Sequence, residues 1–262
     1  MELTSEQLDH FRNEGYLALP DFFTPQETLA IRSEVERLKT EGFLRNITTD
    51  GDGKTHSSAQ QNLQMCPMSP QSPFFRALPF HPKIVQSVSS LIGDPVMLHL
   101  DQVFLKPAHQ GAGTSWHQDN AYFKIRDPLK GTAMWIAVHD AAIANGTLEV
   151  IPKMQNRLLE HSRDPLSDHH IRCFPPEELA VPILLPAGGV VFFCYGTPHC
   201  TRANNTEHER AGVAFHFFNA DFIPDTLKCD PKPTMKNPFL TGPLADGGIA
   251  DYGQDLRSIW SC

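Results

Sequence analysis

The residues best suited to chemistry are His117 and Asp119, which are separated by one residue, and an isolated His199 further along the chain. In an extended strand, residues i and i+2 project to the same side, so His117 and Asp119 can face one ion while Gln118 points away. Two imidazoles and one carboxylate are the ligand set of a non-haem ferrous site, which leaves positions open for an oxo-acid and dioxygen. We therefore predict that His117, Asp119 and His199 bind a metal and form the catalytic centre.

A His-x-Asp triplet is weak evidence by itself, because about one is expected by chance in a chain of this composition. A second triplet, residues 99–101, lies inside the apolar run 96–105 and is interpreted as structural. The setting of His199 favours the first triplet. His199 follows a buried strand expected at 190–195 and a turn at 196–198, a position from which a side chain can reach a cavity.

Arg210 is the predicted anchor for the oxo-acid. A turn at Asn204-Asn205-Thr206 precedes a strand expected at 210–218, and we interpret this strand as the return of the hairpin that delivers His199. The expected strand would then place Arg210, its first residue, beside the metal ligands. A guanidinium can hold a carboxylate through two parallel hydrogen bonds. Arg202, three residues past His199, is the second candidate.

The spacing of these residues resembles that of the phytanoyl-CoA dioxygenase family, a branch of the non-haem iron, 2-oxoglutarate-dependent oxygenases. That family carries a His-x-Asp pair, a distal histidine and an arginine eleven positions beyond it, which is the separation of His199 and Arg210. Further similarity covers roughly residues 3–220 and lies in Gly15-Tyr16, Pro20-Asp21-Phe22-Phe23-Thr24-Pro25, Lys106-Pro107, Trp135, and Asn145-Gly146-Thr147-Leu148-Glu149-Val150-Ile151-Pro152.

The resemblance implies an oxidoreductase that uses Fe(II), 2-oxoglutarate as cosubstrate and O2, with ascorbate as a candidate reductant. The implied reaction is hydroxylation of an unactivated C–H bond of a small-molecule metabolite, with release of succinate and CO2. Arg210 is expected to bind the far carboxylate of 2-oxoglutarate. Further expected contacts to the cosubstrate come from Trp135, Gln118, Gln102 and Lys106, the last two sharing one strand face four residues apart.

Departures from the family pattern concern the loops. Lys153-Met154-Gln155 stands where the family has Gly-Ser-His, and Gly188-Gly189 where it has Gly-Asp, so substrate and loop structure cannot be carried over. The presence of Asp119 disfavours halogenation, because related iron halogenases have a small residue there and let chloride take the vacated position.

Three alternatives stay open at this point. A zinc hydrolase can also use two histidines and one aspartate with an open water position. A cupin-like binding protein can keep the fold without turnover. The same iron site can also lead to desaturation, ring expansion or epoxidation instead of hydroxylation.

Composition favours one enzyme domain with a small-molecule substrate. A chain of 262 residues with 40% hydrophobic content can bury a large core. A net charge of −8 without a basic cluster argues against a nucleic-acid partner. No leader, membrane-length apolar run or Cys-x-x-Cys pair occurs among the six cysteines, so we expect a cytoplasmic protein with reduced thiols and no membrane partner. Monomer and homodimer both remain open.

The elements that must position these residues are predicted to form a single mainly β domain with flanking helices, over residues 1–262. Its architecture is a double-stranded β-helix, that is, a cupin-like jelly roll. Helices at 5–14 and 25–41, the second capped by Thr24, form a helical buttress at 1–41. A polar segment at 45–73 is a candidate lid. A helix at 82–91 leads into a jelly-roll core at 96–220, and a Pro- and Gly-rich tail follows at 221–262. The expected core strands lie near 96–105, 115–124, 132–138, 147–151, 181–185, 190–195 and 210–218.

Overall fold

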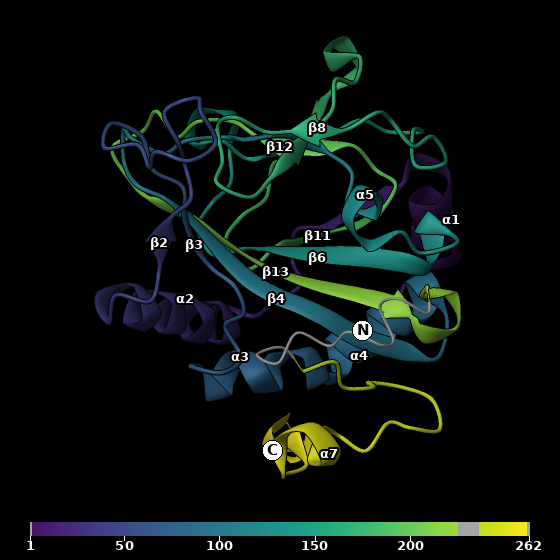
Figure 1. Ribbon diagram of the computed structural model, residues 1–262. Helices are drawn as coiled ribbons and strands as arrows, with labels where there is room; N and C mark the ends of the chain where they lie inside the picture. The colour runs from purple at the N-terminus through teal and green to yellow at the C-terminus, as the bar shows by residue number, and fades with distance from the viewer. Residues whose placement is uncertain (1, 225–235, 261–262) are drawn as a thin grey trace.

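The computed structural model describes residues 2–224 and 236–260, which form two facing β-sheets with helices against one outer side (Figure 1). The larger sheet is antiparallel. Its strands, in spatial order, are β1 (Tyr16–Leu19), β11 (Val190–Cys194), β6 (Gly131–Ala137), β13 (Arg210–Asn219), β4 (Val96–Lys106), β3 (Leu63–Met65) and β2 (Arg45–Asn46).

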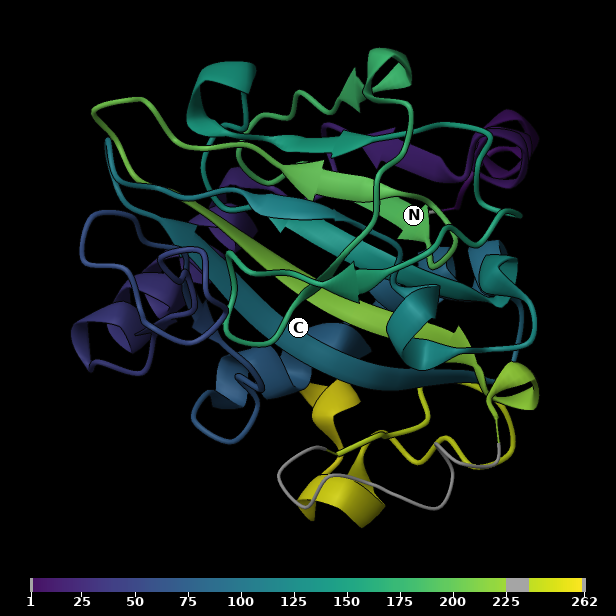
Figure 2. The ribbon, with the colours of Figure 1, turned by 45° about the horizontal axis from the view of Figure 1, so that its top comes forward.

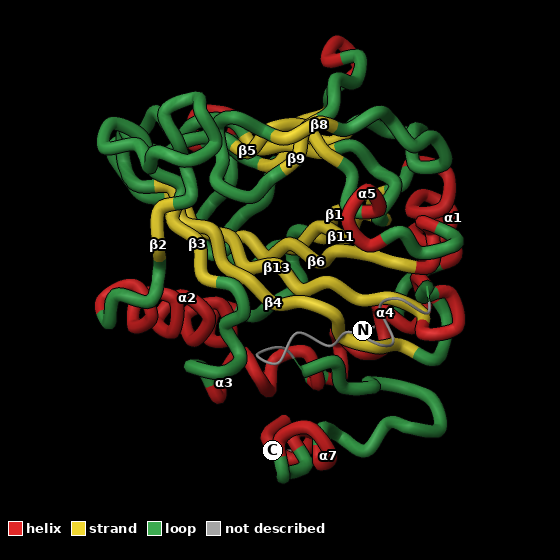
Figure 3. Tube along the Cα trace, in the orientation of Figure 1, coloured by secondary structure: helices red, strands yellow, loops and turns green. Residues whose placement is uncertain are grey.

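The smaller sheet lies across from the larger one, and the two layers of strands are visible in Figure 3. Its strands, in spatial order, are β10 (Val181–Pro182), β7 (Leu148–Val150), β12 (His199–Thr201) and β5 (Thr114–His117). A separate pair, β8 (Ser162–Arg163) and β9 (Ile171–Arg172), comes from the long insertion between core strands. Two antiparallel sheets that share one interior confirm the predicted jelly roll with flanking helices.

Helices begin and end where their capping residues stand. In α1 (Ser5–Glu14) and α2 (Pro25–Thr40), Thr4 and Thr24 each form a capping box with the residue three positions later, so two backbone N–H groups are satisfied at each start. Among the described residues, the remaining α-helices are α3 (Pro73–Ala77), α4 (Pro82–Ile92), α5 (Asn120–Phe123) and α7 (Ile249–Tyr252). Short 3-10 turns lie at Leu78–Phe80, Pro128–Lys130, Ile143–Asn145, Glu177–Leu179, Ala220–Phe222 and Leu256–Trp260.

The larger sheet is buried on both faces. Its outer face packs against α2 and α4, which lie below it in Figure 1. Along β6, Met134 and Ile136 turn toward the helices, whereas Ala133, Trp135 and Ala137 turn toward the smaller sheet. Because every second residue changes face, the inner positions of the larger sheet become one wall of the space between the sheets.

The pairing of the last core strand differs from the prediction. The strand that starts at Arg210 is not the return of the strand that delivers His199, since β13 pairs with β4 and β6 in the larger sheet while β12 pairs with β5 and β7 in the smaller one. The chain changes sheet on both sides of β12, as it does in a jelly roll. Arg210 and His199 therefore come from different sheets, and Figure 2 shows the strands of both sheets from a second direction.

The expected strand at 115–124 is wrong in its second half. β5 ends at His117, and α5 begins three residues later. Asp119 has helical dihedral angles, φ −59° and ψ −33°, and its carbonyl accepts hydrogen bonds from the backbone N–H groups of Tyr122 at 3.0 Å and Phe123 at 3.1 Å. The turn is held from outside as well, because the Asn120 N–H donates to the Tyr195 carbonyl at 2.8 Å.

The segment at 45–73 and the tail have more regular structure than expected. β2 and β3 add the first segment to the edge of the larger sheet. In the described part of the tail, Leu256 is fully buried and the Trp260 Nε1–H donates to the Ala77 carbonyl of α3 at 2.9 Å. Residues 225–235 of the predicted tail lie outside the described residues. Across the described ranges, no helix combines the length and apolarity needed to cross a membrane.

Candidate functional site

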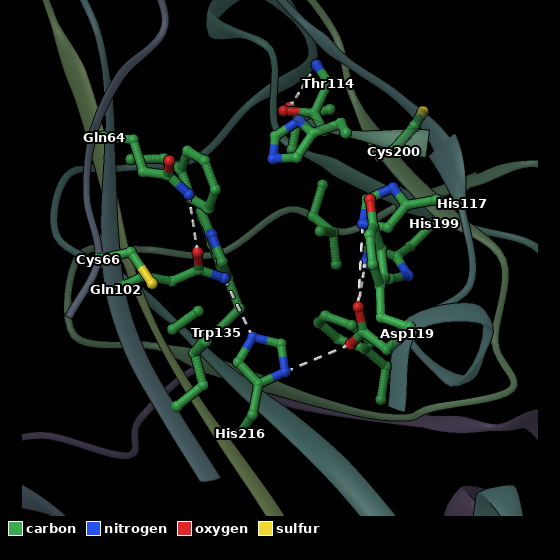
Figure 4. Close-up of a pocket in the computed structure, with 18 of the residues that line it drawn as sticks. Gln64, Cys66, Gln102, Thr114, His117, Asp119, Trp135, His199, Cys200 and His216 are labelled. Atoms are coloured by element: carbon green, nitrogen blue, oxygen red, sulfur yellow. Dashed lines mark hydrogen bonds and ion pairs between the residues drawn. The ribbon is translucent and has the colours of Figure 1, made fainter. Parts of the chain in front are cut away.

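His117, Asp119 and His199 converge at one end of the smaller sheet. His117 is the last residue of β5 and His199 the first of β12, and the two are direct partners in the pairing of these strands. The Asp119 Oδ1 atom lies 3.9 Å from the His117 Nε2 and 3.7 Å from the His199 Nε2. One potential ligand atom from each residue lies within 4.8 Å of the others (Figure 4). Among the described residues this is the group of side chains that could hold a metal ion.

Both imidazoles are oriented by their own backbone. The His117 Nδ1 lies 2.8 Å from the Ser115 carbonyl, and the His199 Nδ1 lies 3.0 Å from the Thr197 carbonyl. A carbonyl only accepts, so each Nδ1 carries the proton and each Nε2 presents its lone pair toward Asp119. Burial lowers the pKa of His199 to about 3 and favours its neutral form. Neutral imidazoles held by backbone carbonyls beside a carboxylate are a donor set that suits Fe(II).

Asp119 is buried and ionised. Burial opposes its ionisation, but the imidazoles of His199, His216 and His117 outweigh this cost and hold the pKa of the carboxyl below its usual range. The helical turn at Asp119, and not a continuing strand, turns its carboxylate toward the two histidines. The predicted ligands therefore meet, although by a different backbone geometry from the one that predicted them.

Gln118 does not contact the cavity, and its expected role as a cosubstrate contact is wrong in this structure. It is fully buried, and its amide nitrogen donates to the Arg157 carbonyl at 2.7 Å and the Gly196 carbonyl at 2.5 Å. Its amide oxygen accepts from the Leu159 N–H at 2.8 Å. Because all three partners are backbone groups of nearby loops, Gln118 fixes the turn that precedes His199.

A cavity of about 610 Å³ fills the space between the sheets, beside the three ligands. Its opposite wall comes from the inner face of the larger sheet, where Arg210, Lys106, Gln102 and Trp135 all line it. Four expected contacts thus share one cavity with the metal ligands. Its volume lies within the range of roughly 300–1,000 Å³ that is usual for small-molecule sites.

The inner end of this cavity is basic. Arg210 and Lys106 are cross-strand partners, each is almost completely buried, and no carboxylate pairs with either in the described part of the chain. Burial lowers the pKa of Arg210 to about 9, so its guanidinium stays protonated at neutral pH. Burial, with Arg210 as a second cause, lowers the pKa of the Lys106 ammonium well below its usual range. Buried charges are normally paired, so this end is suited to an anionic ligand.

Backbone and ring contacts hold the Arg210 side chain. Its Nη2 donates to the Gly146 carbonyl and its Nε to the Asn145 carbonyl at 3.4 Å, and its guanidinium lies 5.5 Å from the centre of the Trp135 ring. Gly146 has φ +72°, and a Cβ there would meet the Arg202 carbonyl oxygen, so this turn requires glycine. The Asn-Gly segment of the family pattern thus supplies the carbonyls that orient the arginine.

Arg202, the second candidate, does not reach the cavity. Its side chain is 44% exposed and pairs with Glu149 at 2.9 Å and Glu177 at 2.7 Å. In the other His-x-Asp triplet, His99 and Leu100 line the cavity but Asp101 does not. The Asp101 carboxylate accepts from the backbone N–H groups of Met68 and Ser69, at 2.5 and 2.8 Å, and takes no part in the metal group.

Two loops meet at the mouth of the cavity, residues 45–57 and 163–170, which we call the mouth loops. The Asp168 carboxylate joins them, because it pairs with Arg45 and, at 3.1 Å, with the His56 Nε2. The Asp168 N–H also donates to the Ile47 carbonyl at 3.0 Å. The candidate lid at 45–73 therefore forms part of the cavity rim, and its movement stays a prediction.

Several residues of the cavity wall had no role in the sequence-based prediction: Arg45, Gln64, His169, His170 and His216. His169 and His170 come from an irregular loop, where no periodicity gives the direction of a side chain. His216 could have been found, because it lies on β13 an even number of residues after Arg210 and so shares its face.

Comparison with known proteins places the chain in a family. Residues 11–212 match the family described as phytanoyl-CoA dioxygenase (PhyH). An ectoine dioxygenase of Bordetella parapertussis is 24% identical over 241 residues, which cover 83% of this chain and 76% of that protein. Phytanoyl-CoA dioxygenase domain-containing protein 1 of Mus musculus is 26% identical over 266 residues, which cover 83% and 91%.

Solved structures share the fold. The non-haem α-ketoglutarate-dependent carbocyclase SnoK from nogalamycin biosynthesis matches with a TM-score of 0.73 and 21% identity, over 91% of this chain and 97% of that one. EctD from S. alaskensis, solved with 2-oxoglutarate and 5-hydroxyectoine, matches with a TM-score of 0.67 and 20% identity, over 84% and 77%. The family match covers most of the chain, and His117, Asp119, His199 and Arg210 line one cavity. The chain therefore belongs to the phytanoyl-CoA dioxygenase family and is an oxidoreductase, a dioxygenase that depends on iron and 2-oxoglutarate.

Proposed function

We propose that this protein hydroxylates an unactivated C–H bond of a small-molecule metabolite, with release of succinate and CO2. The observation that carries the proposal is the pairing of two features across one cavity. A His-Asp-His group with its Nε2 atoms turned inward lies on one wall, and a buried arginine without an acidic partner in the described part of the chain lies on the other. Iron and 2-oxoglutarate, when bound, supply the activation of dioxygen.

The role of each side chain in the site follows from its position in the cavity. His117, Asp119 and His199 hold the metal, and Arg210 holds the far carboxylate of 2-oxoglutarate, with Lys106 beside it. Trp135 stacks near the guanidinium and closes this end of the cavity with an apolar surface. The outer part of the cavity, toward the mouth loops, is left for the substrate.

The charges around the cavity argue against an acyl-CoA substrate. CoA phosphates need several cations. Of the cations in the mouth loops, Arg45 lines the cavity and is already paired with Asp168, whereas Lys54 and Arg163 do not line it. A small metabolite fits the cavity better. Several relatives are named for a small molecule, ectoine, which agrees with a substrate of that size.

The alternatives receive less support from the cavity. A zinc hydrolase gains nothing from the buried Arg210 at the inner end of the cavity. A binding protein without turnover does not need the His-Asp-His group across the cavity from that arginine. Desaturation or epoxidation uses the same residues and differs only in how the substrate lies. The free thiols of Cys173, Cys194 and Cys200 support the expected cytoplasmic location.

The test is anaerobic titration of the apoprotein with Fe(II) and 2-oxoglutarate, followed through the visible charge-transfer band of the chelate. The wild type is expected to show the band and, in air, to release succinate. Asp119→Ala, titrated in chloride-free buffer so that chloride cannot take the vacated position, is expected to lose the band. Absence of the band in the wild type, together with tight binding of Zn(II), would reject the oxygenase function and favour a hydrolase.

A further inference from the structure

We propose that His216, Gln102 and Gln64 are positioning residues, a chain of polar side chains that holds one oxygen of Asp119 on the side away from the Nε2 atoms of His117 and His199. This inference rests on the metal site of the proposed function. The three residues come from the adjacent strands β13, β4 and β3, and their side chains line the same cavity. Figure 4 shows the chain running from Gln64 through Gln102 and His216 to Asp119.

The direction of the hydrogen bonds follows from their chemistry. The Gln64 Nε2 donates to the Gln102 Oε1 at 3.0 Å, which leaves the Gln102 Nε2 facing the His216 Nε2 at 3.1 Å. An amide nitrogen only donates, so the His216 Nε2 accepts and the proton of the neutral imidazole is on Nδ1. That Nδ1 lies 3.5 Å from the Asp119 Oδ2. Every donor in the chain therefore points toward the carboxylate.

The reverse arrangement is unfavourable. If both amides were rotated, the Gln102 oxygen would accept from the His216 Nε2, and the Nδ1 lone pair would face the Asp119 carboxylate. Two acceptors would then oppose each other in a buried place, since His216 and Asp119 are both 4% exposed. Among the described residues, neither the His216 Nδ1 nor the Asp119 Oδ2 has a hydrogen-bond partner, and the two atoms face each other at 3.5 Å. A small shift of either side chain would therefore pair two buried polar atoms that are otherwise unsatisfied.

The chain assigns different roles to the two oxygens of Asp119. Oδ1 faces the Nε2 atoms of His117 and His199, at 3.9 and 3.7 Å, whereas Oδ2 faces His216. Asp119 can then bind the metal through Oδ1 alone. With its second oxygen directed toward His216, Asp119 would leave positions on a bound metal open for 2-oxoglutarate and dioxygen.

The surroundings keep the His216 ring in this orientation. Phe123 packs edge-on at 5.5 Å between ring centres, and Tyr195 lies at 6.0 Å. Among the described residues, neither ring makes a hydrogen bond with Nδ1. Rotation of the imidazole would also break its contact with Gln102. The pairing of β13 with β4 therefore helps to orient His216, and through it the carboxylate of Asp119 on the opposite wall.

The test uses Co(II) as a spectroscopic substitute for Fe(II), with the full-length apoprotein. We would measure the Co(II) dissociation constant and the visible absorption spectrum of the wild type, His216→Phe, Gln102→Leu and the double variant. Loss of the donor to a metal-binding carboxylate is expected to weaken Co(II) binding roughly 10- to 100-fold in His216→Phe. A spectrum changed by binding through both oxygens is expected as well. Gln102→Leu is expected to show a smaller change in the same direction.

The double variant decides whether the residues act as one chain. If Gln102 acts through His216, the double variant binds Co(II) like His216→Phe alone, since residues of one network are not additive. Phe104→Leu, on the same strand as Gln102 and lining the same cavity, is the matched control. Additive losses, or Co(II) affinity and a spectrum in His216→Phe equal to those of the wild type, would overturn the chain. Failure of the wild type to bind Co(II) would instead reject the metal site itself.

Discussion

Replacing Arg210 with methionine is expected to weaken 2-oxoglutarate binding strongly while the protein stays folded. A guanidinium has five N–H donors. In the described part of the chain, Arg210 uses two of its nitrogens, Nε and Nη2, on the carbonyls of Asn145 and Gly146. The donors that remain are enough for a carboxylate held by two parallel hydrogen bonds.

The magnitude follows from the burial of the pair. Arg210 is 1% exposed, so solvent does not screen a carboxylate bound to it. Removing one partner of a buried, hydrogen-bonded charge pair costs about 2–5 kcal/mol. At about 1.4 kcal/mol for each factor of ten, the dissociation constant of 2-oxoglutarate rises by roughly 30- to 4,000-fold. Lys106 stays beside the site and can replace part of the lost attraction, so we expect a value nearer to 100-fold.

The stability of the apoprotein should behave differently from its affinity. Wild-type Arg210 buries a cation without an acidic partner in the described part of the chain, which opposes folding. Methionine fills a similar volume without that charge, although two carbonyls lose a donor. The unfolding temperature of the apoprotein is therefore expected to stay close to the wild-type value. The stabilisation that Fe(II) and 2-oxoglutarate give the wild type should be much smaller in the variant.

The assay is an anaerobic titration of Fe(II)-loaded protein with 2-oxoglutarate, followed through the charge-transfer band and paired with thermal unfolding. Arg202→Met is the matched control, because Arg202 is the other arginine near His199 and is paired at the surface with Glu149 and Glu177. It should bind 2-oxoglutarate like the wild type. If Arg210→Met binds within threefold of the wild type, or if Arg202→Met shows the larger loss, the assignment of the cosubstrate anchor is incorrect.

Three further perturbations test other parts of the site. The pKa of Lys106 is lowered on folding, so the unfolded chain holds this proton up to about pH 10.5 and the folded protein releases it earlier. The unfolding free energy of the wild type therefore rises with pH in that window. Lys106→Met lacks this group, so its unfolding free energy, measured with urea, should exceed that of the wild type most at low pH, and the difference should shrink toward pH 10.5. A Cβ at Gly212 would lie 2.4 Å from atoms of the Trp135 ring. Gly212→Ala should therefore lower the unfolding free energy by about 1–3 kcal/mol, measured by denaturant titration. An unchanged unfolding free energy would show that the Trp135 ring moves aside without cost. Asp168→Asn should speed amide hydrogen exchange in both mouth loops while Co(II) affinity stays unchanged. Exchange rates equal to those of the wild type would mean that the backbone hydrogen bonds between the loops are enough to hold them together.

The parts of the fold that follow from local rules could be predicted from the sequence. The first two helices end within one residue of the predicted bounds, because their limits depend on capping residues that lie within a few positions of each terminus. The metal ligands and Arg210 could be found because three spacings agree with one family pattern at once. The pairing of strands could not, since the partner of β13 is β4, more than a hundred residues earlier in the chain, and not its neighbour in sequence.

Errors at Asp119 and Gln118 have one physical origin. The prediction assumed that an extended strand continues through both residues, but the α5 turn starts at Asp119, where the Asn120 N–H bonds to the Tyr195 carbonyl. A residue far along the chain therefore decides the local conformation. The i and i+2 rule gave the correct ligands here because the two side chains can converge through a turn as well as along a strand.

His216 was not predicted, because the residue pattern of a fully buried strand does not show which face meets the cavity. All ten residues of β13 are buried, so neither hydrophobicity nor burial distinguishes the face that meets the cavity from the face that meets the helices. Arg210 distinguishes the two faces, because placing its charge against an apolar layer would be unfavourable. Counting by twos from Arg210 leads through Ala214 to His216, and both line the cavity. The count stops being valid at the irregular pairing after His216, so the same rule that identifies the partner of Asp119 also shows where the wall of the site ends.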